Sequence, residues 1–149
     1  MDIQYRSIIP ADMPELVRLI RTELIPMSYT VSPDDASVIA GLPDRFRSGV
    51  TIVASPKNGG KPFGFIHYGQ LQGMLHIDML VVNPQHRRSG IGLKLLKQAE
   101  QNGKNARNLM SVLYVDDVNE KARRFYTREG YEPVRYHPEL KVTLFTKPL

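Results

Sequence analysis

The chain contains no cysteine, and only four of its 149 residues are histidine. Without thiols, disulfide bonds, thiolate metal ligands and a cysteine-linked covalent intermediate are all excluded. The zinc motif H-E-x-x-H does not occur either, so we expect no resident metal. No apolar run approaches the roughly 18 residues that a membrane span needs, and the N-terminal residues lack the basic-then-apolar order of a signal peptide. We therefore expect a cytoplasmic protein without a membrane partner.

What the sequence does contain is typical of a soluble globular domain. Hydrophobic residues make up 42% of the chain and charged residues 23%, which excludes collagen, a coiled coil and wholesale disorder. A chain of this length is about one domain long and buries roughly 68 to 70% of its unfolded surface. Because we find no repeat, low-complexity tract or linker, we expect one domain over residues 1–149.

Positive charge is concentrated in one segment of the chain. Residues 84–128 hold ten basic and four acidic side chains, a net charge of +6, whereas the rest of the chain has a net charge of −1. A basic segment within an otherwise balanced domain indicates an anionic partner. Charge alone leaves three classes of partner open: a nucleic acid, a membrane surface and a phosphorylated small molecule.

Hydrophobic periodicity and turn residues predict one mixed α/β fold. Asn58-Gly59-Gly60 is a strong hairpin signal between two short apolar runs, and Ser32 with Pro33 forms a helix start. After Pro84 the apolar period changes from two to about 3.6. The predicted order is strand, two helices, three strands, helix, strand, helix and two strands. We expect strands over residues 3–9, 50–54, 63–68, 75–82, 109–115, 131–136 and 142–146, and helices over 11–24, 33–46, 91–103 and 120–129.

A turn with two glycines connects the strand that ends near Val82 to the next helix. The first backbone N–H groups of a helix lack internal partners, and the helix dipole adds positive charge there, so this turn could bind an anion. Arg87 and Arg88 add formal charge beside it. An ordinary turn would have the same pattern. The third glycine of a dinucleotide fingerprint would fall at Leu95, and no P-loop pattern occurs, so both of those interpretations are excluded.

Two spaced motifs together resemble the GCN5-related N-acetyltransferase (GNAT) family. The segment Pro84-x-x-Arg87-x-x-Gly90-Ile91-Gly92 is similar to that family's R/Q-x-x-G-x-G/A pyrophosphate loop. Further along, Asn119-x-x-Ala122-x-x-Phe125-Tyr126-x-x-x-Gly130-Tyr131 is similar to its later asparagine and tyrosine motif. The opening Arg6-x-Ile8-x-Pro10-Ala11-Asp12 and the order of predicted elements also match, so the resemblance spans essentially the whole chain. It implies a GNAT-like fold whose central strands, 75–82 and 109–115, splay apart.

The resemblance implies that acetyl-coenzyme A is the co-substrate. Backbone N–H groups from Arg87 to Leu93 would hold its pyrophosphate, with charge support from Arg87 and Arg88. The pantetheine arm would lie along Met79–Val82 like an added strand, and a backbone N–H near Leu80 would polarise the thioester carbonyl. The residues expected at the coenzyme are Leu80, Val81, Val82, Arg87, Arg88, Ser89, Gly90, Ile91, Gly92, Leu93 and Asn119.

Tyr126 and Asn119 each have a structural and a functional interpretation. Tyr126 matches the family position that protonates the leaving coenzyme A thiolate, and a phenol with a pKa of about 10 is protonated at neutral pH. By periodicity alone, Tyr126 would instead form a helix-packing pair with Phe125. Asn119 suits a helix N-cap before Glu120, and in the family the matching asparagine also hydrogen-bonds the coenzyme arm, so both roles are compatible.

The resemblance implies that a primary amine attacks the thioester directly in a ternary complex. The lack of cysteine supports this only partly, because serine or histidine could still form a covalent intermediate. The period-two rule places His76, Asp78 and Leu80 on one face of their strand. In the family an acidic residue here commonly accepts the amine proton, directly or through water, so Asp78 is the first candidate base and His76 the second. Asp116 and Asp117 either attract a cationic acceptor or form a turn.

The resemblance implies that acceptor specificity comes from the first two helices and the loop between them, here residues 22–33, with help from the hairpin around His137. Glu23 is the only charged residue of that loop, which argues against a highly cationic acceptor. Small amines, amino acids, aminoglycoside-like compounds and protein amines all stay open. So does a homodimer, since many family members pair into dimers.

Two functions of other classes compete with the enzyme hypothesis. One is a nucleic-acid-binding module that uses the basic segment, but this segment lacks interleaved aromatic platforms and a helix-turn-helix pattern. The other is a catalytically silent acyl-coenzyme A sensor, which the presence of Tyr126 disfavours. We therefore expect an N-acetyltransferase with no nucleic-acid partner.

Overall fold

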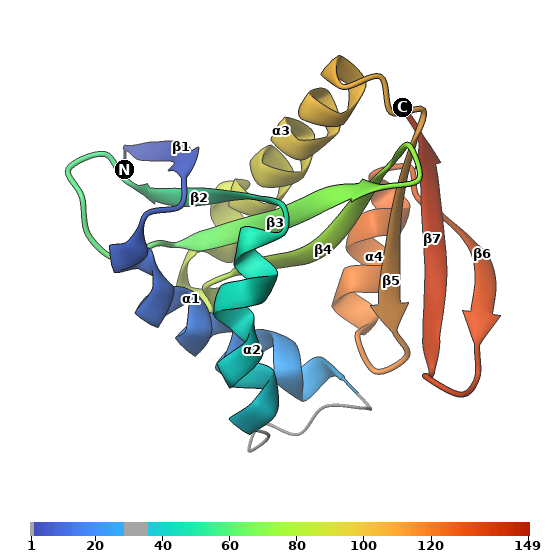
Figure 1. Ribbon diagram of the computed structural model, residues 1–149, viewed down its shortest axis with the longest axis horizontal. Helices are drawn as coiled ribbons and strands as arrows, with labels where there is room; N and C mark the ends of the chain where they lie inside the picture. Colours follow the sequence, from blue (N-terminus) through green and yellow to red (C-terminus); the bar gives the residue numbers. More distant parts are fainter. Residues whose placement is uncertain (1, 29–35) are drawn as a thin grey trace.

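The computed structural model describes residues 2–28 and 36–149, and the side chain of Arg88 lies outside this part, as do Ser32 and Pro33. The elements follow the predicted order, which confirms the mixed α/β fold class (Figure 1). The helices are α1 (Met13–Leu19), α2 (Ala36–Arg47), α3 (Ile91–Asn105) and α4 (Glu120–Arg128). The strands are β1 (Ile3–Ser7), β2 (Val50–Pro56), β3 (Gly64–Leu71), β4 (Met74–Val82), β5 (Met110–Asp116), β6 (Glu132–His137) and β7 (Val142–Pro148).

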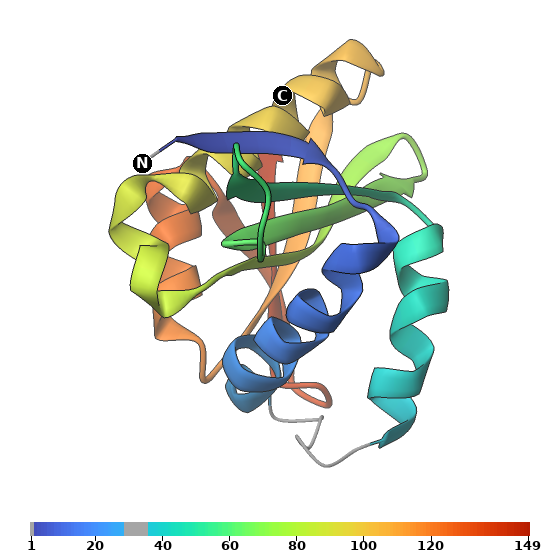
Figure 2. The same ribbon diagram turned by 90° about the vertical axis from the view of Figure 1, so that its left-hand side faces the viewer.

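The seven strands form one sheet in the order β1-β2-β3-β4-β5-β7-β6. Neighbouring strands are antiparallel apart from β4 and β5, which are parallel and are connected through α3. Helices α1 and α2 lie on one face of the sheet, and α3 and α4 lie on the other (Figures 1 and 2). Both faces of β4 are therefore covered, whereas Tyr114 of β5 stays exposed.

Each face of the sheet has its own hydrophobic core. The predicted stripe of α3 is fully buried, and each of its large side chains contributes about 1.5–3 kcal/mol relative to exposure; it consists of Ile91, Leu95, Leu96 and Ala99. On the opposite face, Leu16 and Leu19 of α1 pack with Leu42 and Phe46 of α2. No helix in the described part of the chain is both long enough and apolar enough to cross a membrane.

The predicted first helix changes type along its length. A 3-10 turn (Pro10–Asp12) precedes α1, and a π-helical turn (Ile20–Leu24) and a second 3-10 turn (Ile25–Met27) follow it. Pro26 has no N–H to donate, so it cannot continue the regular helical bonding. π-helical turns widen a helix locally and are frequent at functional sites. The one in this chain carries Glu23.

A buried polar network joins α3 to the C-terminal strands. Tyr131 Oη donates to Glu100 Oε2 at 2.8 Å and lies 2.7 Å from Ser111 Oγ. Lys147 Nζ donates to the two carboxylate oxygens of Glu100 at 3.0 and 3.1 Å. Glu100 is only 4% exposed, and its charge is tolerated because these donors satisfy it. Since Ser111 pairs with Leu75 of β4, the network sits where the two central strands are joined.

Candidate functional site

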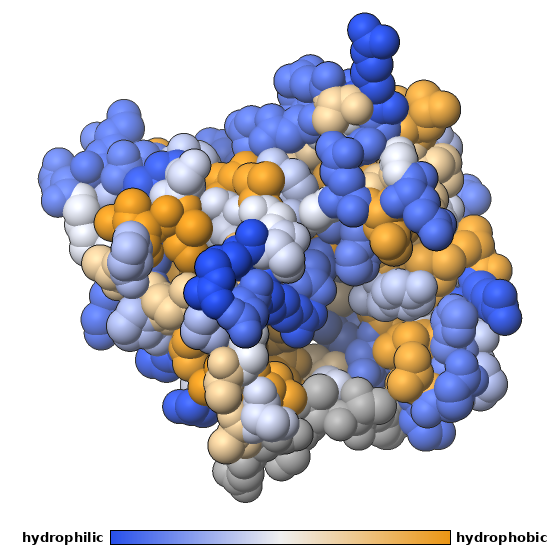
Figure 3. Space-filling view, in the orientation of Figure 1, coloured by the Kyte–Doolittle hydropathy of each residue, from blue (hydrophilic) through white to orange (hydrophobic). Residues whose placement is uncertain are grey.

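The two central strands, β4 and β5, separate toward their C-terminal ends. Within the described residues, their ladder is limited to the pairs Leu75–Ser111 and His76–Val112, whereas β4 stays paired with β3 and β5 with β7 along their lengths. A cleft of about 920 Å³ lies beside this opening, and the surface is hollowed between the α2 side and the β6–β7 side (Figure 3). The predicted splay of the central strands is thus confirmed.

Backbone groups of β4 point into the opening. Asn83 N donates to Phe63 O at 2.7 Å across the β3 side. Bonded and non-bonded pairs alternate in an antiparallel ladder, so Leu80 and Val82 direct their N–H and C=O groups away from β3. Val82 O accordingly accepts a bond from Arg87 Nε at 3.3 Å. The end of β4 therefore offers main-chain donors and acceptors to the cleft.

A β-bulge at Asp78 reverses the faces of β4. His67 pairs with Met79, but the next residue of β3, Tyr68, pairs with Ile77, which leaves Asp78 as the extra residue. A bulge shifts the alternation of side chains by one position. Ile77 accordingly packs in the core under α3, whereas Met79 packs in the core under α1 and α2.

The bulge corrects one part of the period-two prediction. Ile77 faces α3, so its neighbour His76 faces the α2 side, and Asp78 also faces α2, where it pairs with Arg45. These two residues share a face, as predicted. Leu80 does not, because it packs against the core on the α3 side.

Asp78 is held by a two-pronged ion pair. Arg45, in the last turn of α2, donates from Nε and Nη2 to the two Asp78 oxygens at 2.8 and 2.6 Å. The Asp78 side chain is 20% exposed, and its hydrogen bond raises the pKa of Arg45 above the ordinary value. A carboxylate has about four lone-pair positions, and Arg45 occupies two of those of Asp78. Asp78 would therefore have to accept a proton at a remaining position while Arg45 stays bound.

His76 belongs to a row of aromatic rings. Its ring meets the half-exposed Tyr114 edge-on at 6.3 Å, and Tyr114 in turn meets His137 at 5.8 Å. The row runs across the α2 side of the sheet, from β4 over β5 to the end of β6. It brings the predicted hairpin residue His137 onto the same side as His76.

The glycine turn has the geometry expected of an anion site. Residues Pro84–Ser89 form a 3-10 turn that Asn83 caps by accepting a bond from Gln85 N at 3.0 Å. Gly90 follows with φ +72°, and α3 then begins without a side-chain cap. The N–H groups of its first three residues, 91–93, therefore have no partner inside the helix.

The second glycine of the turn has no reason to be glycine from packing alone. A Cβ atom on Gly92 would lie 3.6 Å from Val82 Cγ2 and 3.9 Å from Phe125 Cζ, which are ordinary contacts. Gly92 also has no positive φ. Close approach of a ligand to the helix start is the remaining physical reason for a missing side chain.

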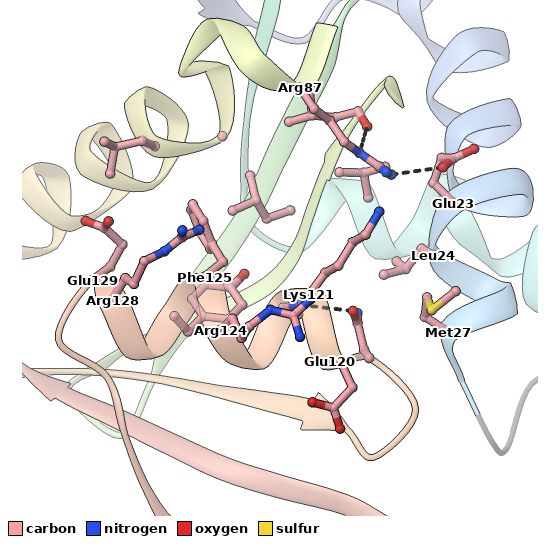
Figure 4. A pocket seen from close by; sticks show the side chains of 18 of the residues that line it. Glu23, Leu24, Met27, Arg87, Glu120, Lys121, Arg124, Phe125, Arg128 and Glu129 are labelled. Atoms are coloured by element: carbon pink, nitrogen blue, oxygen red, sulfur yellow. Dashed lines mark hydrogen bonds and ion pairs between the residues drawn. The ribbon is translucent and has the colours of Figure 1, made fainter. Parts of the chain in front are cut away.

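Arg87 extends across the cleft instead of staying with its own turn. Its Nη2 donates to Glu23 Oε1 at 2.9 Å, on the π-helical turn (Figure 4). The guanidinium thereby connects the π-helical turn to the carbonyl of Val82 at the end of β4. This ion pair was not predicted. The one sign of it in the sequence is that Glu23 is the only charged residue of its loop.

Tyr126 lines the cleft and is 8% exposed. Its ring packs edge-on against Phe125 at 5.1 Å and Tyr131 at 5.4 Å, so the predicted packing pair with Phe125 is confirmed. Burial raises the pKa of Tyr126 far above its ordinary value, which keeps the phenol protonated. Among the described residues its hydroxyl has no recorded hydrogen-bond partner, so the proton is available to a ligand.

Three cations on one face of α4 line the same cleft, and these were not predicted. They are Lys121, Arg124 and Arg128, spaced three and four residues apart. Such spacing places side chains on one helix face, so the signal was present in the sequence. Asn119 caps this helix by accepting a bond from Ala122 N at 3.1 Å, which confirms its structural role. With Arg87, these cations outnumber the glutamates of the lining, Glu23, Glu120 and Glu129, so the lining has a net positive charge suited to phosphate groups.

A family model described as the Acetyltransferase (GNAT) family matches residues 16–131. The chain belongs to the GNAT acetyltransferase family. No curated protein matches the chain. Solved structures share the GNAT fold at low identity. PaiA N-acetyltransferase from Thermoplasma acidophilum, in complex with coenzyme A, is 18% identical, with a TM-score of 0.80 over 100% of both chains. Ard1 from Thermoplasma volcanium is 19% identical, with a TM-score of 0.79 over 100% of this chain and 99% of that one.

The cleft of this GNAT protein gathers most of the residues predicted for the coenzyme. The lining includes Leu80, Val81, Val82, Arg87, Gly90, Gly92, Leu93, Asn119 and Tyr126. Ser89 is exposed and outside that lining, and the Ile91 side chain is buried in the core, so Ile91 could contribute only through its backbone. The candidate bases Asp78 and His76 also lie outside the described lining and face the α2 side.

The predicted acceptor loop and the two aspartates after β5 occupy different places in the structure. Ile25, in the loop after α1, is buried and serves the core, whereas Met27 is exposed and lines the cleft. Asp116 accepts a bond from Val118 N, and Asp117 accepts one from the Tyr136 hydroxyl. Asp116 thus stabilises the predicted turn, whereas the Asp117 carboxylate contacts β6, and the attraction of a cationic acceptor stays a prediction.

Proposed function

We propose that this GNAT enzyme transfers the acetyl group of acetyl-coenzyme A to a primary amine by direct attack in a ternary complex. The observation that carries the proposal is the position of the uncapped start of α3 at the mouth of the β4–β5 cleft. The N–H groups of residues 91–93 and the cations of α4 would hold the phosphates. The acyl arm would then extend along β4 toward Tyr126.

The thioester carbonyl would be polarised by β4. Leu80 directs its N–H away from β3, so it can donate to the oxygen on which negative charge grows in the transition state. Removing such a donor from other enzymes slows turnover about a hundredfold or more. The bulge at Asp78 supports this role because it sets which residues of β4 face the opening.

Tyr126 would donate a hydrogen bond to the departing thiolate. A thiol of the cysteine type has a pKa of about 8.5, well below the raised pKa of this buried phenol. Net transfer of the phenolic proton to the thiolate is therefore unfavourable, unless the amine proton released at the same time replaces it. The hydroxyl thus serves best as a donor and relay between the attacking amine and the leaving sulfur.

An acceptor that arrives as an ammonium ion must lose one proton before it can attack, and for this proton Asp78 stays the first candidate acceptor and His76 the second. The further proton that the nitrogen loses after the attack is the one that Tyr126 relays to the sulfur. Asp78 and His76 both face the α2 side of the opening, opposite the coenzyme side. Because Arg45 occupies Asp78, transfer through an intervening water fits the geometry better than direct contact. The acceptor would then enter from the side that carries Tyr114 and His137.

Thiol release tests the proposal. Acetyl-coenzyme A is incubated with butylamine, lysine, an aminoglycoside or a peptide with a free N-terminus, and the release of coenzyme A thiol is measured for each amine. Calorimetry with coenzyme A alone measures binding separately. Absence of coenzyme A binding, or binding without thiol release for any amine of the panel, would contradict the proposal.

The Tyr126→Phe variant tests the relay. We expect turnover to fall about 10- to 100-fold, at the lower end of general acid effects, with coenzyme A affinity unchanged within about twofold. Tyr131→Phe is the matched control, because it removes a buried hydroxyl from the polar network outside the cleft and should lower stability instead of turnover. Full turnover in Tyr126→Phe would remove this hydroxyl from the mechanism.

A further inference from the structure

The ion pair between Arg87 and Glu23 lies in the cleft where the coenzyme would bind. The Arg87 side chain is 40% exposed and that of Glu23 is 22% exposed, so solvent and ligands can reach both. Nε and Nη2, one donor edge of the guanidinium, are both engaged, the first with Val82 O and the second with Glu23. The pair thus closes a bridge from β4 to the π-helical turn (Figure 4).

Both groups that Arg87 engages are needed elsewhere if the proposed function holds. The carbonyl of Val82 belongs to the stretch of β4 where the acyl arm would lie. The guanidinium belongs to the turn where the diphosphate would bind. A diphosphate and the Glu23 carboxylate are both anions, so they compete for this guanidinium.

We infer that Glu23 is an internal competitor of the coenzyme for Arg87, and that coenzyme binding uncovers Glu23 for the acceptor amine. In the free protein, the guanidinium neutralises Glu23. When the diphosphate takes over Arg87, the carboxylate is left facing the cleft beside Leu24 and Met27. A single ammonium group can then replace the guanidinium, so Glu23 selects acceptors that carry one positive charge near the reacting amine.

The inference rests on the proposed function, and a coenzyme A titration separates the two. Calorimetry with coenzyme A, which carries no acyl group and cannot react, is run on the wild type, Glu23→Gln, Arg87→Ala and the double variant. We expect Glu23→Gln to bind coenzyme A about two- to fivefold more tightly, the range expected for a partly exposed ion pair. In the Arg87→Ala background the same substitution should give no gain.

Glu120→Gln is the matched control for charge. Glu120 also lines the cleft, so its substitution removes one negative charge without touching the ion pair. If Glu23 weakened binding only by repelling the phosphates, Glu23→Gln and Glu120→Gln would gain similar affinity for coenzyme A. The gain from Glu23→Gln would then also appear in the Arg87→Ala background. Either result refutes the competition. Equal or weaker binding by folded Glu23→Gln refutes it as well, whereas a wild type that does not bind coenzyme A refutes the proposed function itself.

The acceptor half has its own readout. For each reactive amine that carries a second ammonium group, such as lysine or the aminoglycoside, Glu23→Gln should raise the KM of the amine at saturating acetyl-coenzyme A by about fivefold or more, with kcat little changed. The KM of butylamine, which has no second charge, should not change. Glu23→Asp should restore part of the lost affinity because it keeps the charge. A KM of the amines with a second ammonium group that stays constant in Glu23→Gln refutes a role for Glu23 in acceptor binding.

Discussion

Replacing Gly92 with alanine should weaken coenzyme A binding while leaving the free protein as stable as before or slightly more so. Gly92 is the second residue of α3 and does not have a positive φ, so alanine fits its backbone. Glycine is about 0.5–1 kcal/mol less favourable than alanine inside a helix. At the first turn the lower figure applies, which raises Tm by about 1–2 °C in a chain of this size.

The loss of affinity follows from the space above the helix start. The added methyl group makes ordinary contacts with Val82 and Phe125, and it occupies the approach to the N–H groups of residues 91–93. Losing one charge-assisted hydrogen bond weakens binding by about 1.5–3 kcal/mol, which is roughly 10- to 100-fold in Kd. Calorimetry with coenzyme A and a thermal melt of the free protein measure the two effects separately.

Gly73→Ala is the control for this experiment. Gly73 has φ +78° in the turn between β3 and β4, with nothing within 4 Å of an added Cβ atom, so alanine there is strained by about 1–2 kcal/mol without a clash. We expect Gly73→Ala to melt at a lower temperature and to bind coenzyme A normally. If folded Gly92→Ala bound coenzyme A as tightly as the wild type, the diphosphate would not lie on the start of α3, and the proposed site would be wrong.

Three further outcomes are expected. Asp78→Asn should lower turnover and change its pH profile. An unchanged rate and profile would assign the proton transfer to another group or a water chain. Because burial raises the pKa of Tyr126 and of Tyr131, the unfolded chain loses these protons first, so the free energy of unfolding should fall as pH rises above about 10; denaturant titrations that show no fall would contradict this burial. Glu100→Gln should lower the free energy of unfolding by about 1–3 kcal/mol, since Lys147 loses its charged partner, and a melt unchanged from the wild type would refute that role.

The features that could be predicted from the sequence are those encoded by neighbouring residues. The buried stripe of α3 follows from an apolar spacing of three and four. The anion site follows from the proline and the two glycines that connect a strand to this helix. The splay of β4 from β5 was available only through the resemblance to a family, because no local pattern states which strands separate.

The bulge at Asp78 escaped prediction because both faces of β4 are covered. Buried residues continue to alternate with partly exposed ones along the whole strand, although Ile77 belongs to one core and Met79 to the other. A strand with one wet face would have shown a break in its pattern at the extra residue. Because β4 is covered on both sides, its burial pattern shows no break at the extra residue.

The ion pairs at the site escaped prediction because their partners are distant in sequence. Arg45 and Asp78 are 33 residues apart, and Glu23 and Arg87 are 64 apart. Only the fold brings these side chains together. The sequence marked Asp78 as a candidate base and Arg87 as a coenzyme residue, but it did not show that each is held by an ion pair.

The buried network around Glu100 gives the molecule a fastened end and an open end. Ser111, Tyr131 and Lys147 connect β5 and β7 to Glu100 of α3 where the central strands are still bonded, at the end of the sheet away from the opening. Substitutions of the residues around the opening can then change which amines enter, while the network keeps the sheet intact. Libraries aimed at new acceptors should keep the network unchanged and vary the residues around the opening.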